Sequence, residues 1–446
     1  MNAPTLMVRG DSLATAARAV PSERWTQWLK VDAAELSVYG VVPIGPGALV
    51  ELSSAQDDRR VATLLAWDDG DEGGDPLALH PDGRALVAGE ALPDVRDALF
   101  DFALRGHSDR EGSTEIASQP SGERAPGVIP SSRVVEGVIE YESVASLHLE
   151  SELRPQEPLD IEVARHLTHA GCPSISRLLA VLTVRDAESE AQRHWGGLLE
   201  HWPKTVPGRV AFRAELESHH LTDRARALGA TVWQFHQALA NDTDSLRFKT
   251  REVNAQDIQE WHRELVDTAT RSMNGLLRVR DRLDLDSSAA GLEHELPSRL
   301  AETLSQGSML ISKVTGAGGR KTRVHGMLDL DALVRRTDGS YLFIDFARGH
   351  GRLASPVRDL AQLLHSLSLT LRENDSLREV RAALLNGYFD DEAEQELIPP
   401  TPHRLLALVQ LFEMIAAYRD LEERIRDRRP CSPALIALHT LTGARP

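Results

Sequence analysis

The chain has 446 residues, 41% of them hydrophobic and 26% charged, so it is long enough for two or three domains with cores of their own. Its 50 lysine and arginine residues against 67 aspartate and glutamate residues give a net charge of −17. An acidic surface repels phosphate backbones, which argues against a nucleic-acid partner. Two cysteines, Cys172 and Cys431, are too few for a disulfide framework or a thiolate metal site, so we expect a reducing compartment, the cytoplasm.

A membrane association is not expected either. No stretch of the sequence approaches the roughly 18 apolar residues that a membrane span requires. Residues 1–20 lack the basic run and apolar core of an export signal, so we also expect no export.

Residues 1–105 predict a small β-rich unit. Short apolar runs alternate there with turn signals, at Leu36–Val42, Ala48–Leu52, Val61–Trp67 and Ala85–Val87. The unit ends in a predicted helix at Asp94–Leu104. Residues 106–133 are rich in Ser, Gly, Pro, Glu and Arg with almost no apolar periodicity, which predicts a linker or long loop.

The rest of the chain predicts two lobes of different character. Residues 134–200 combine a strand-like stretch with a helix at Asp160–Ala170. Residues 201–446 are mostly helical by apolar spacing, interrupted by one strand-loop-strand passage, with helices predicted at Arg224–Ala240 and Val253–Arg282 and again from Pro356, Leu377 and Pro402. This order predicts an α+β, bilobal, protein-kinase-like fold with a small β-rich N-terminal cap.

The passage RVHGMLDLDALVRRTDGSYLFIDFARGHG, residues 323–351, resembles the catalytic stretch of maltokinases and related aminoglycoside-phosphotransferase-like sugar kinases. That stretch runs approximately His-Gly-Asp-x-His-x-Gly-Gln, then a short hairpin, then Ile-Asp-Phe-Glu. The resemblance covers roughly residues 140 to 440, and it is further carried by Asp160–Leu182, Ser355–Leu367, Leu384–Tyr388 and Arg428–Leu438.

The resemblance implies ATP and Mg²⁺ as cofactors, yet the matching residues are degenerate. Phosphoryl transfer needs a carboxylate base, two oxygen ligands for the metal and a lysine on the phosphates. The base position falls on Met327, whose thioether accepts no proton at neutral pH. The metal-binding amide falls on Ala332, and the acidic residue that follows the Asp-Phe pair falls on Ala347. The metal-binding aspartate is present as Asp345.

The nucleotide-binding residues of the first lobe are matched in part. The lysine position falls on His148, and a neutral imidazole is a poor phosphate clamp near pH 7. Its usual carboxylate partner is matched by Glu162, so the resemblance implies His148, Glu162 and Asp345 for nucleotide binding.

Two acidic residues beyond Met327 offer substitutes. Asp329 could replace the base, although two residues in an extended chain span roughly 6 to 7 Å, which exceeds hydrogen-bond reach. Asp331 is a weak candidate for a second metal ligand beside Asp345. The favoured alternative is that both residues cap or solvate a loop.

These substitutions favour a maltokinase-like pseudokinase, a non-catalytic binding or regulatory protein. The family implies a link to trehalose, maltose and glycogen metabolism, with trehalose synthase or an active maltokinase as partner and a sugar or nucleotide as ligand. The alternative is an active ATP-dependent sugar kinase, such as a maltokinase that phosphorylates the sugar 1-position, acting on maltose or an amino sugar through Asp329 and Asp345. A module that only binds sugar or nucleotide is a third hypothesis.

Overall fold

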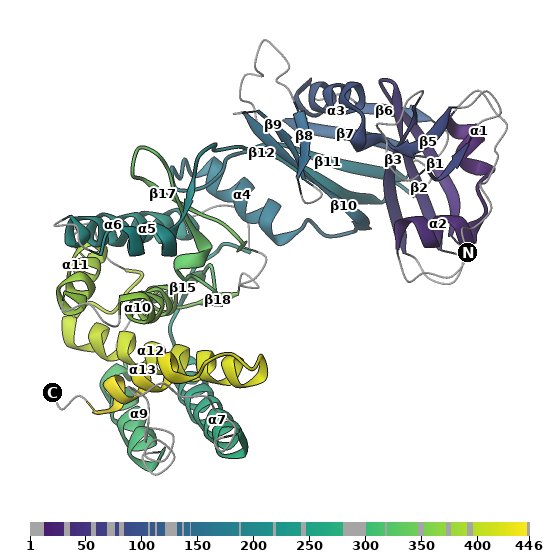
Figure 1. The fold of residues 1–446 in the computed structure, drawn as a ribbon. Coiled ribbons are helices and arrows are strands. Elements are labelled where there is room, and N and C mark those ends of the chain that lie inside the picture. The colour runs from purple at the N-terminus through teal and green to yellow at the C-terminus, as the bar shows by residue number, and fades with distance from the viewer. Residues whose placement is uncertain are drawn as a thin grey trace. The chain divides into compact units, whose positions relative to one another are not determined.

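A computed structural model gives the fold of the chain (Figure 1). It describes residues 13–30, 36–54, 59–68, 76–79, 84–105, 108–111, 114–120, 132–135, 138–142, 144–186, 189–216, 220–241, 247–279, 300–316, 319–346, 352–371, 376–389 and 396–443. Among these residues no helix combines the length and apolar character that a membrane span needs. The chain divides into two compact units, residues 1–168 with 176–203 and residues 169–175 with 204–446.

The first unit is built on antiparallel strands. Within the described residues they follow the order β1-β2-β3-β10-β12-β11-β7-β6; in addition β5 pairs with β3 and β4 with β5, and β9 pairs with β10 and β8 with β9. Their bounds are β1 Leu36–Ile44, β2 Gly47–Ser54, β3 Arg60–Asp68, β4 Ala78–Leu79, β5 Ala85–Ala88, β6 Ser108–Glu111, β7 Thr114–Pro120, β8 Ser132–Val135, β9 Val138–Tyr141, β10 Ala145–Arg154, β11 Leu178–Asp186 and β12 Gln192–Glu200. The helices are α1 Leu13–Arg18, α2 Ser22–Leu29, η1 Gly89–Ala91, α3 Pro93–Arg105 and α4 Leu159–His169.

Apolar runs become the buried strands of this unit. The first six residues of β2 are all buried, because helices α1 and α2 contact the β1–β2 part of the sheet on one side while the other side also faces the interior. One hydrophobic cluster forms around Trp25 of α2, and a second joins α3 to the strands through Phe100, Tyr141 and Trp195. The strands predicted between residues 36 and 87 and the helices predicted at 94–104 and 160–170 are confirmed.

The linker predicted at residues 106–133 holds two strands and the start of a third. Strand β6 pairs with β7, and β7 pairs with β11 along its whole length, from Thr114 to Pro120. The prediction failed because β7 carries one large apolar residue, Ile116, so it shows no hydrophobic alternation; its order comes from backbone hydrogen bonds to its neighbours. Residues 121–131 lie outside the described residues.

The second unit is mainly helical. Its helices are α5 Gly208–Ala214, α6 Leu221–Ala240, α7 Ala255–Val279, α9 Leu300–Val314, η3 Leu330–Ala332, α10 Val357–Leu371, α11 Leu377–Phe389, α12 Pro402–Arg426 and α13 Ser432–Gly443. Its strands are β13 Val206–Pro207, β14 Arg251–Glu252, β15 Arg320–Arg323, β16 Leu333–Arg335, β17 Tyr341–Phe343 and β18 Leu353–Ala354. They form two small sheets in the orders β13-β16-β17 and β14-β15-β18 within the described residues. The helices predicted from Arg224, Val253, Pro356, Leu377 and Pro402 are confirmed.

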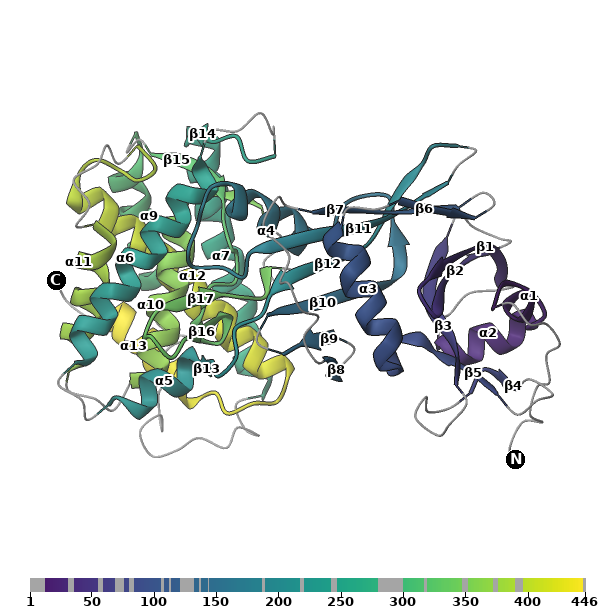
Figure 2. The same cartoon turned by 90° about the horizontal axis from the view of Figure 1, so that it is seen from above.

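Helices α6 and α11 lie side by side in both views (Figure 1, Figure 2). A glycine on each helix allows the close approach. A Cβ added to Gly229 of α6 would overlap the carbonyl oxygen of Leu384, and a Cβ added to Gly387 of α11 would overlap the carbonyl oxygen of Arg226. The two backbones therefore touch directly, which brings the side chains on their facing surfaces within hydrogen-bond range.

The boundaries of the two units differ from those predicted from the sequence. The predicted cap, residues 1–105, and the predicted first-lobe remainder, residues 134–200, belong to one unit. The unit ends at residue 203, close to the predicted boundary at 200, while residues 169–175 join the second unit. Phe343 of β17 accounts for part of this, because its backbone N–H donates to the carbonyl of Ser174.

Candidate functional site

The degenerate motif forms a loop between β15 and η3 in the second unit. His325 and Gly326 are buried, and Gly326 has a φ of 85°, a left-handed conformation that favours glycine. The Nε2–H group of His325 donates to the carbonyl oxygen of Ile344 at 2.7 Å. This bond ties the loop to the segment that carries Asp345.

A buried carboxylate holds the loop by its backbone. Asp359, in the first turn of α10, is fully buried and accepts hydrogen bonds from the backbone N–H of His325 at 2.7 Å and of Gly326 at 2.8 Å. Its third contact is His236 Nε2 at 3.2 Å. Burial acts to raise the pKa of Asp359, but His236, His325 and the backbone donor of Gly326 outweigh it and hold the pKa below its usual range.

His236 is itself positioned by the crossing of α6 and α11. Its Nδ1 lies 2.8 Å from the hydroxyl of Tyr388, a residue that is also fully buried. With Nε2–H directed at the carboxylate, Nδ1 accepts a hydrogen bond from the Tyr388 hydroxyl. Burial and the nearby Asp359 raise the pKa of Tyr388 well above its ordinary value, so the phenol stays neutral. The chain Tyr388–His236–Asp359 therefore fixes the loop with every link satisfied.

Met327, which the sequence resemblance predicts at the base position, lies in this loop. Its side chain is partly buried, and its sulfur lies 4.0 Å from the amide nitrogen of Gln362 on α10. Ala332, at the position of the metal-binding amide, is 1% exposed and offers no ligand atom. The loop therefore has a backbone held by hydrogen bonds, and the positions that the resemblance predicts for the base and a metal ligand carry a thioether and a methyl group.

Asp329 serves as a cap. It is the N-cap of η3, and its Oδ1 accepts from the backbone N–H of Asp331 and of Ala332, both at 2.9 Å. The favoured alternative from the sequence, that Asp329 caps a loop, is confirmed. The cap uses Oδ1 alone, so the role of Asp329 as a substitute base stays a prediction.

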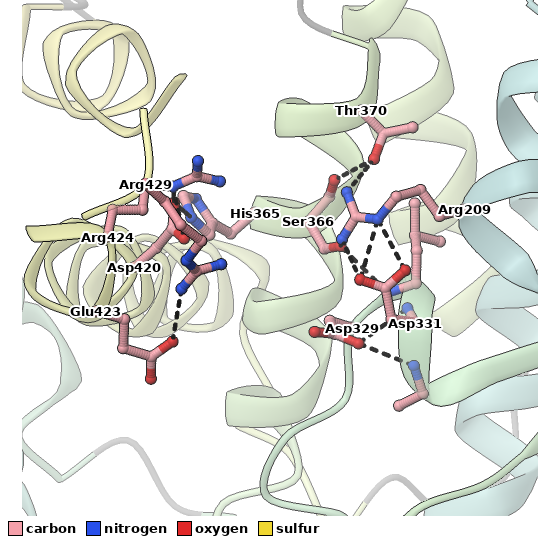
Figure 3. A network of polar contacts seen from close by, with 12 residues as sticks. Arg209, Asp329, Asp331, His365, Ser366, Thr370, Asp420, Glu423, Arg424 and Arg429 are labelled. Carbon is pink, nitrogen blue, oxygen red and sulfur yellow. Dashed lines mark hydrogen bonds and ion pairs between the residues drawn. The ribbon is translucent and has the colours of Figure 1, made fainter. Parts of the chain in front are cut away.

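Asp331 forms an ion pair. Arg209 of α5 binds it with both prongs, Nε to Oδ1 at 2.8 Å and Nη2 to Oδ2 at 2.8 Å (Figure 3). The same arginine donates to the hydroxyls of Thr370 at 2.9 Å and Ser366 at 3.3 Å on α10. The hydrogen bond to Asp331 holds the pKa of Arg209 above its ordinary value. Both oxygens of Asp331 are thus engaged by a cation, which opposes the weak prediction that it binds metal.

Asp345 lies in an unusual backbone conformation. It is exposed and has a φ of 64°, which is uncommon for a residue with a side chain and typical of positions constrained by function. The next residue, Phe346, packs against the His325 ring with centroids 5.1 Å apart. Mg²⁺ prefers carboxylate and other oxygen ligands, so Asp345 fits that ion, while Ala332 supplies no second ligand. Among the described residues no group of three or more His, Cys, Asp or Glu could hold a metal. Ala347 lies outside the described residues.

The candidate nucleotide residues of the first unit lie on β10 and α4. His148 on β10 is partly buried, and its Nε2 lies 3.3 Å from the hydroxyl of Ser146. Burial lowers the pKa of His148 and Asp160 opposes that shift only in part, so the ring is neutral near pH 7. Glu162, on α4, is buried. A neutral ring supports the expectation that His148 is a weak phosphate ligand.

The chain matches known kinases in its fold. A solved structure of glucosamine kinase in complex with glucosamine, ADP and inorganic phosphate matches with a TM-score of 0.68 at 14% identity, over 98% of this chain and 100% of that one. Two further glucosamine kinase structures, crystal forms A and B, have TM-scores of 0.67 and 0.62 at 15% and 16% identity, over 96% of this chain and 97% and 98% of theirs. The chain has the fold of these kinases. The α+β, protein-kinase-like fold predicted from the sequence is confirmed.

No protein-family model matches the sequence, and no curated protein matches it. At these identities the structures establish the fold alone, and the maltokinase family itself is not shown.

The residues that hold the loop were not predicted from the sequence. Asp359 lies in the first turn of a helix that the sequence predicts, but His236 and Tyr388 come from two other helices, 123 and 152 residues from their hydrogen-bond partners. A histidine among apolar residues on α6 was the one available signal, because a buried histidine needs polar partners.

Proposed function

We propose that this protein is a maltokinase-like pseudokinase, a kinase-fold protein that binds its ligand without transferring phosphate. One observation carries the proposal. Met327 stands at the base position of a loop whose backbone Asp359 holds through two hydrogen bonds of 2.7 and 2.8 Å. The backbone of the loop is therefore held in place, and what the loop lacks in this proposal is the carboxylate of a general base.

The missing groups all act on the phosphoryl group or its metal. General-base catalysis by a placed carboxylate contributes about 10²–10⁴-fold to a rate, and a thioether supplies none of it. Ala332 removes a metal ligand, and the neutral His148 replaces a positive charge that would stabilise the phosphates. Three independent losses at one reaction support binding without turnover.

The ligand class follows from the fold relatives and the family resemblance. The glucosamine kinase structure contains glucosamine and ADP. We extend this to a sugar or amino sugar, with ATP or ADP, as ligands of the present chain. The maltokinase resemblance adds a partner protein, a trehalose synthase or an active maltokinase, through which a non-catalytic protein would act in trehalose, maltose or glycogen metabolism.

The proposal is tested by separating binding from turnover. The protein is incubated with ATP, Mg²⁺ and glucosamine, maltose or glucose, and ADP release is followed beside a thermal-shift titration of each ligand. We expect a rise in melting temperature without sugar-dependent ADP release, since a ligand at 100 times its dissociation constant stabilises the folded state by about 2.7 kcal/mol. ADP release that depends on the sugar and disappears in Asp345→Asn would reject the pseudokinase.

The second candidate function is an active sugar kinase. Its support is Asp345, which keeps an exposed carboxylate on a left-handed backbone where the family has its magnesium ligand. In that case Asp329 is the substitute base, and Asp329→Asn should lower the turnover of maltose or an amino sugar by about 10²-fold or more. Because Asn keeps the acceptor oxygen that caps η3, the cap and the base are tested separately.

A further inference from the structure

Three arginines converge on one glutamate in the second unit. Arg358 on α10 binds Glu264 on α7 with both prongs, at 2.7 and 2.6 Å. Arg419 on α12 contacts the same carboxylate, and Nη2 of Arg352 lies 4.0 Å from it. These four residues are called the arginine cluster below. Three positive charges against one negative charge leave two in excess, in a protein whose net charge is −17.

Two further acids act on the outer arginines without a direct contact to them. Asp359 attracts Arg352, while its carboxylate accepts from two backbone donors and His236. Glu423 attracts Arg419 and lies 3.9 Å from Arg429, and Arg271 repels Arg419. These acids offset part of the positive charge, and Glu264 is the one carboxylate that the three arginines share.

Burial and then the neighbouring charges shift the pKa values of the outer arginines. Burial and then repulsion by Arg358 lower the pKa of Arg352, against the attraction of Glu264. Burial also lowers the pKa of Arg419, where Glu264 opposes and Arg358 adds to the shift. A bound anion would oppose the repulsion that Arg358 exerts on both.

The two outer arginines are accessible, and the inner one is fixed. The Arg352 and Arg419 side chains are 47% and 36% exposed, whereas Arg358 is 7% exposed and stacks 4.7 Å above the Phe412 ring. A buried, stacked guanidinium gives a rigid base, and two half-exposed guanidiniums present planar N–H donors to solvent. This arrangement matches the geometry with which arginine binds carboxylate and phosphate.

A purely structural ion-pair network is the simpler explanation, and the same unit shows how such pairs are built. Arg381 binds Glu413 with both prongs, at 2.5 and 2.8 Å, and donates its remaining hydrogen bonds to Ser368 and the Leu364 carbonyl. Each charge there has one opposite charge. The arginine cluster departs from this one-to-one pairing.

The arginine cluster adjoins the fixed loop. The carbonyl oxygen of Arg352 accepts from the backbone N–H of Val324, the residue before His325. Arg358 directly precedes Asp359, whose carboxylate holds the same loop. The backbone segments that carry the arginine cluster thus also hold the backbone of the loop.

We propose that the arginine cluster, Arg352, Arg358 and Arg419 around Glu264, is a binding site for a small molecule that carries a compact anionic group, a phosphate or a carboxylate. The site is independent of whether the protein transfers phosphate. Charge-assisted hydrogen bonds to the two exposed guanidiniums provide the affinity, and Glu264 acts as an internal competitor for them.

Calorimetric titration at low salt tests the site in the full chain. The probes are inorganic phosphate, glucose 6-phosphate and gluconate, with neutral glucose as the reference. We expect saturable binding of at least one anion, weakened by added salt, and tighter than glucose. Binding of the phosphates alone or of gluconate alone assigns the anion class. No saturable anion binding in the millimolar range, or glucose binding as tightly as its phosphate, would overturn the proposal.

Matched variants locate the site. Arg352→Gln and Arg419→Gln should each weaken anion binding by about tenfold or more, because each removes a charge-assisted bond. Arg426→Gln is the control: it lies on the same helix as Arg419, is 69% exposed and pairs with Asp427, away from Glu264. Glu264→Gln should raise the anion affinity, whereas damage to the fold would lower it. Equal losses in the control, or no loss in Arg352→Gln and Arg419→Gln, would place the anion elsewhere.

Discussion

At the scale of single residues, the hydrogen bonds that position the loop are made by its backbone and not by the side chain of Met327. Asp359 binds the loop through main-chain N–H groups, so the backbone at residue 327 keeps its path whichever side chain stands there. The amide nitrogen of Gln362 lies 4.0 Å from the sulfur of Met327. The site should therefore accept a carboxylate without refolding.

We predict that Met327→Asp combined with Ala332→Asn produces sugar-dependent ADP release. The aspartate restores a base and the asparagine a metal ligand beside Asp345, so turnover should rise by about 10²-fold or more over the natural chain. The measurement is ADP formed with ATP, Mg²⁺ and glucosamine or maltose.

The control for this variant is Met327→Asn with Ala332→Asn, which has the same shape but no base. Equal turnover in the two double variants would show that residue 327 does not act as a base. If ADP release does not rise although nucleotide still binds, the idea that the loop lacks only the base and the metal ligand would be wrong.

At the scale of secondary-structure elements, the crossing of α6 and α11 supports the site from a distance. Gly229 and Gly387 let the two backbones touch, and this contact places His236 2.8 Å from Tyr388. A residue with no side chain thus sets the geometry of the hydrogen-bonded chain that ends at Asp359.

We predict that Gly387→Ala destabilises the protein although alanine favours helices. The added Cβ would overlap the Arg226 carbonyl, and helix backbones cannot yield as a flexible side chain does. The free energy of unfolding should fall by about 1–3 kcal/mol, measured by urea denaturation.

Gly275→Ala on α7 is the matched control. Its Cβ would meet Ile425 at 3.5 Å, an ordinary contact, so it should leave stability unchanged or raise it by up to about 1 kcal/mol. Equal effects of the two substitutions would show that the close crossing does not limit stability.

At the scale of the whole molecule, buried acids tie stability to pH. The pKa values of Glu264, Asp359 and Asp420 are all below their usual range: burial opposes the shift in each, and arginine or histidine partners outweigh it. For such groups the unfolded chain binds protons at a higher pH than the folded chain does. Their contribution to stability is complete above the unfolded pKa, near 4, and is lost as pH falls through the lower folded values.

We predict a constant urea midpoint from neutral pH to about 5 and a steep fall below about 4. Asp359→Asn should be less stable at pH 7 by about 3–5 kcal/mol, because it leaves buried donors without a carboxylate, and should lose less stability in acid. Asp267→Asn, at an exposed position of α7, is the control and should behave like the natural chain. An unchanged acid slope in Asp359→Asn would contradict this assignment.

Much of the fold follows from local pattern, and the rest depends on distant pairing. Apolar spacing predicts β1 to β3 and the long helices, because residues close together in the sequence form their buried faces. Strand β7 has no such face and is ordered by β11, which the sequence alone does not reveal. The methionine at the predicted base position can be read from the motif, whereas the support by Asp359 and the arginine cluster is assembled from helices far apart in the chain.

The methionine at the centre of the loop also makes the site observable. The chain has 6 methionines, so labelling their methyl groups with ¹³C would give a spectrum of few signals. Met327 lies next to Gly326, which Asp359 holds, and Asp359 follows Arg358 directly in α10. Met327 thus supplies a native spectroscopic reporter, whose chemical shift should register any molecule that binds beside the loop.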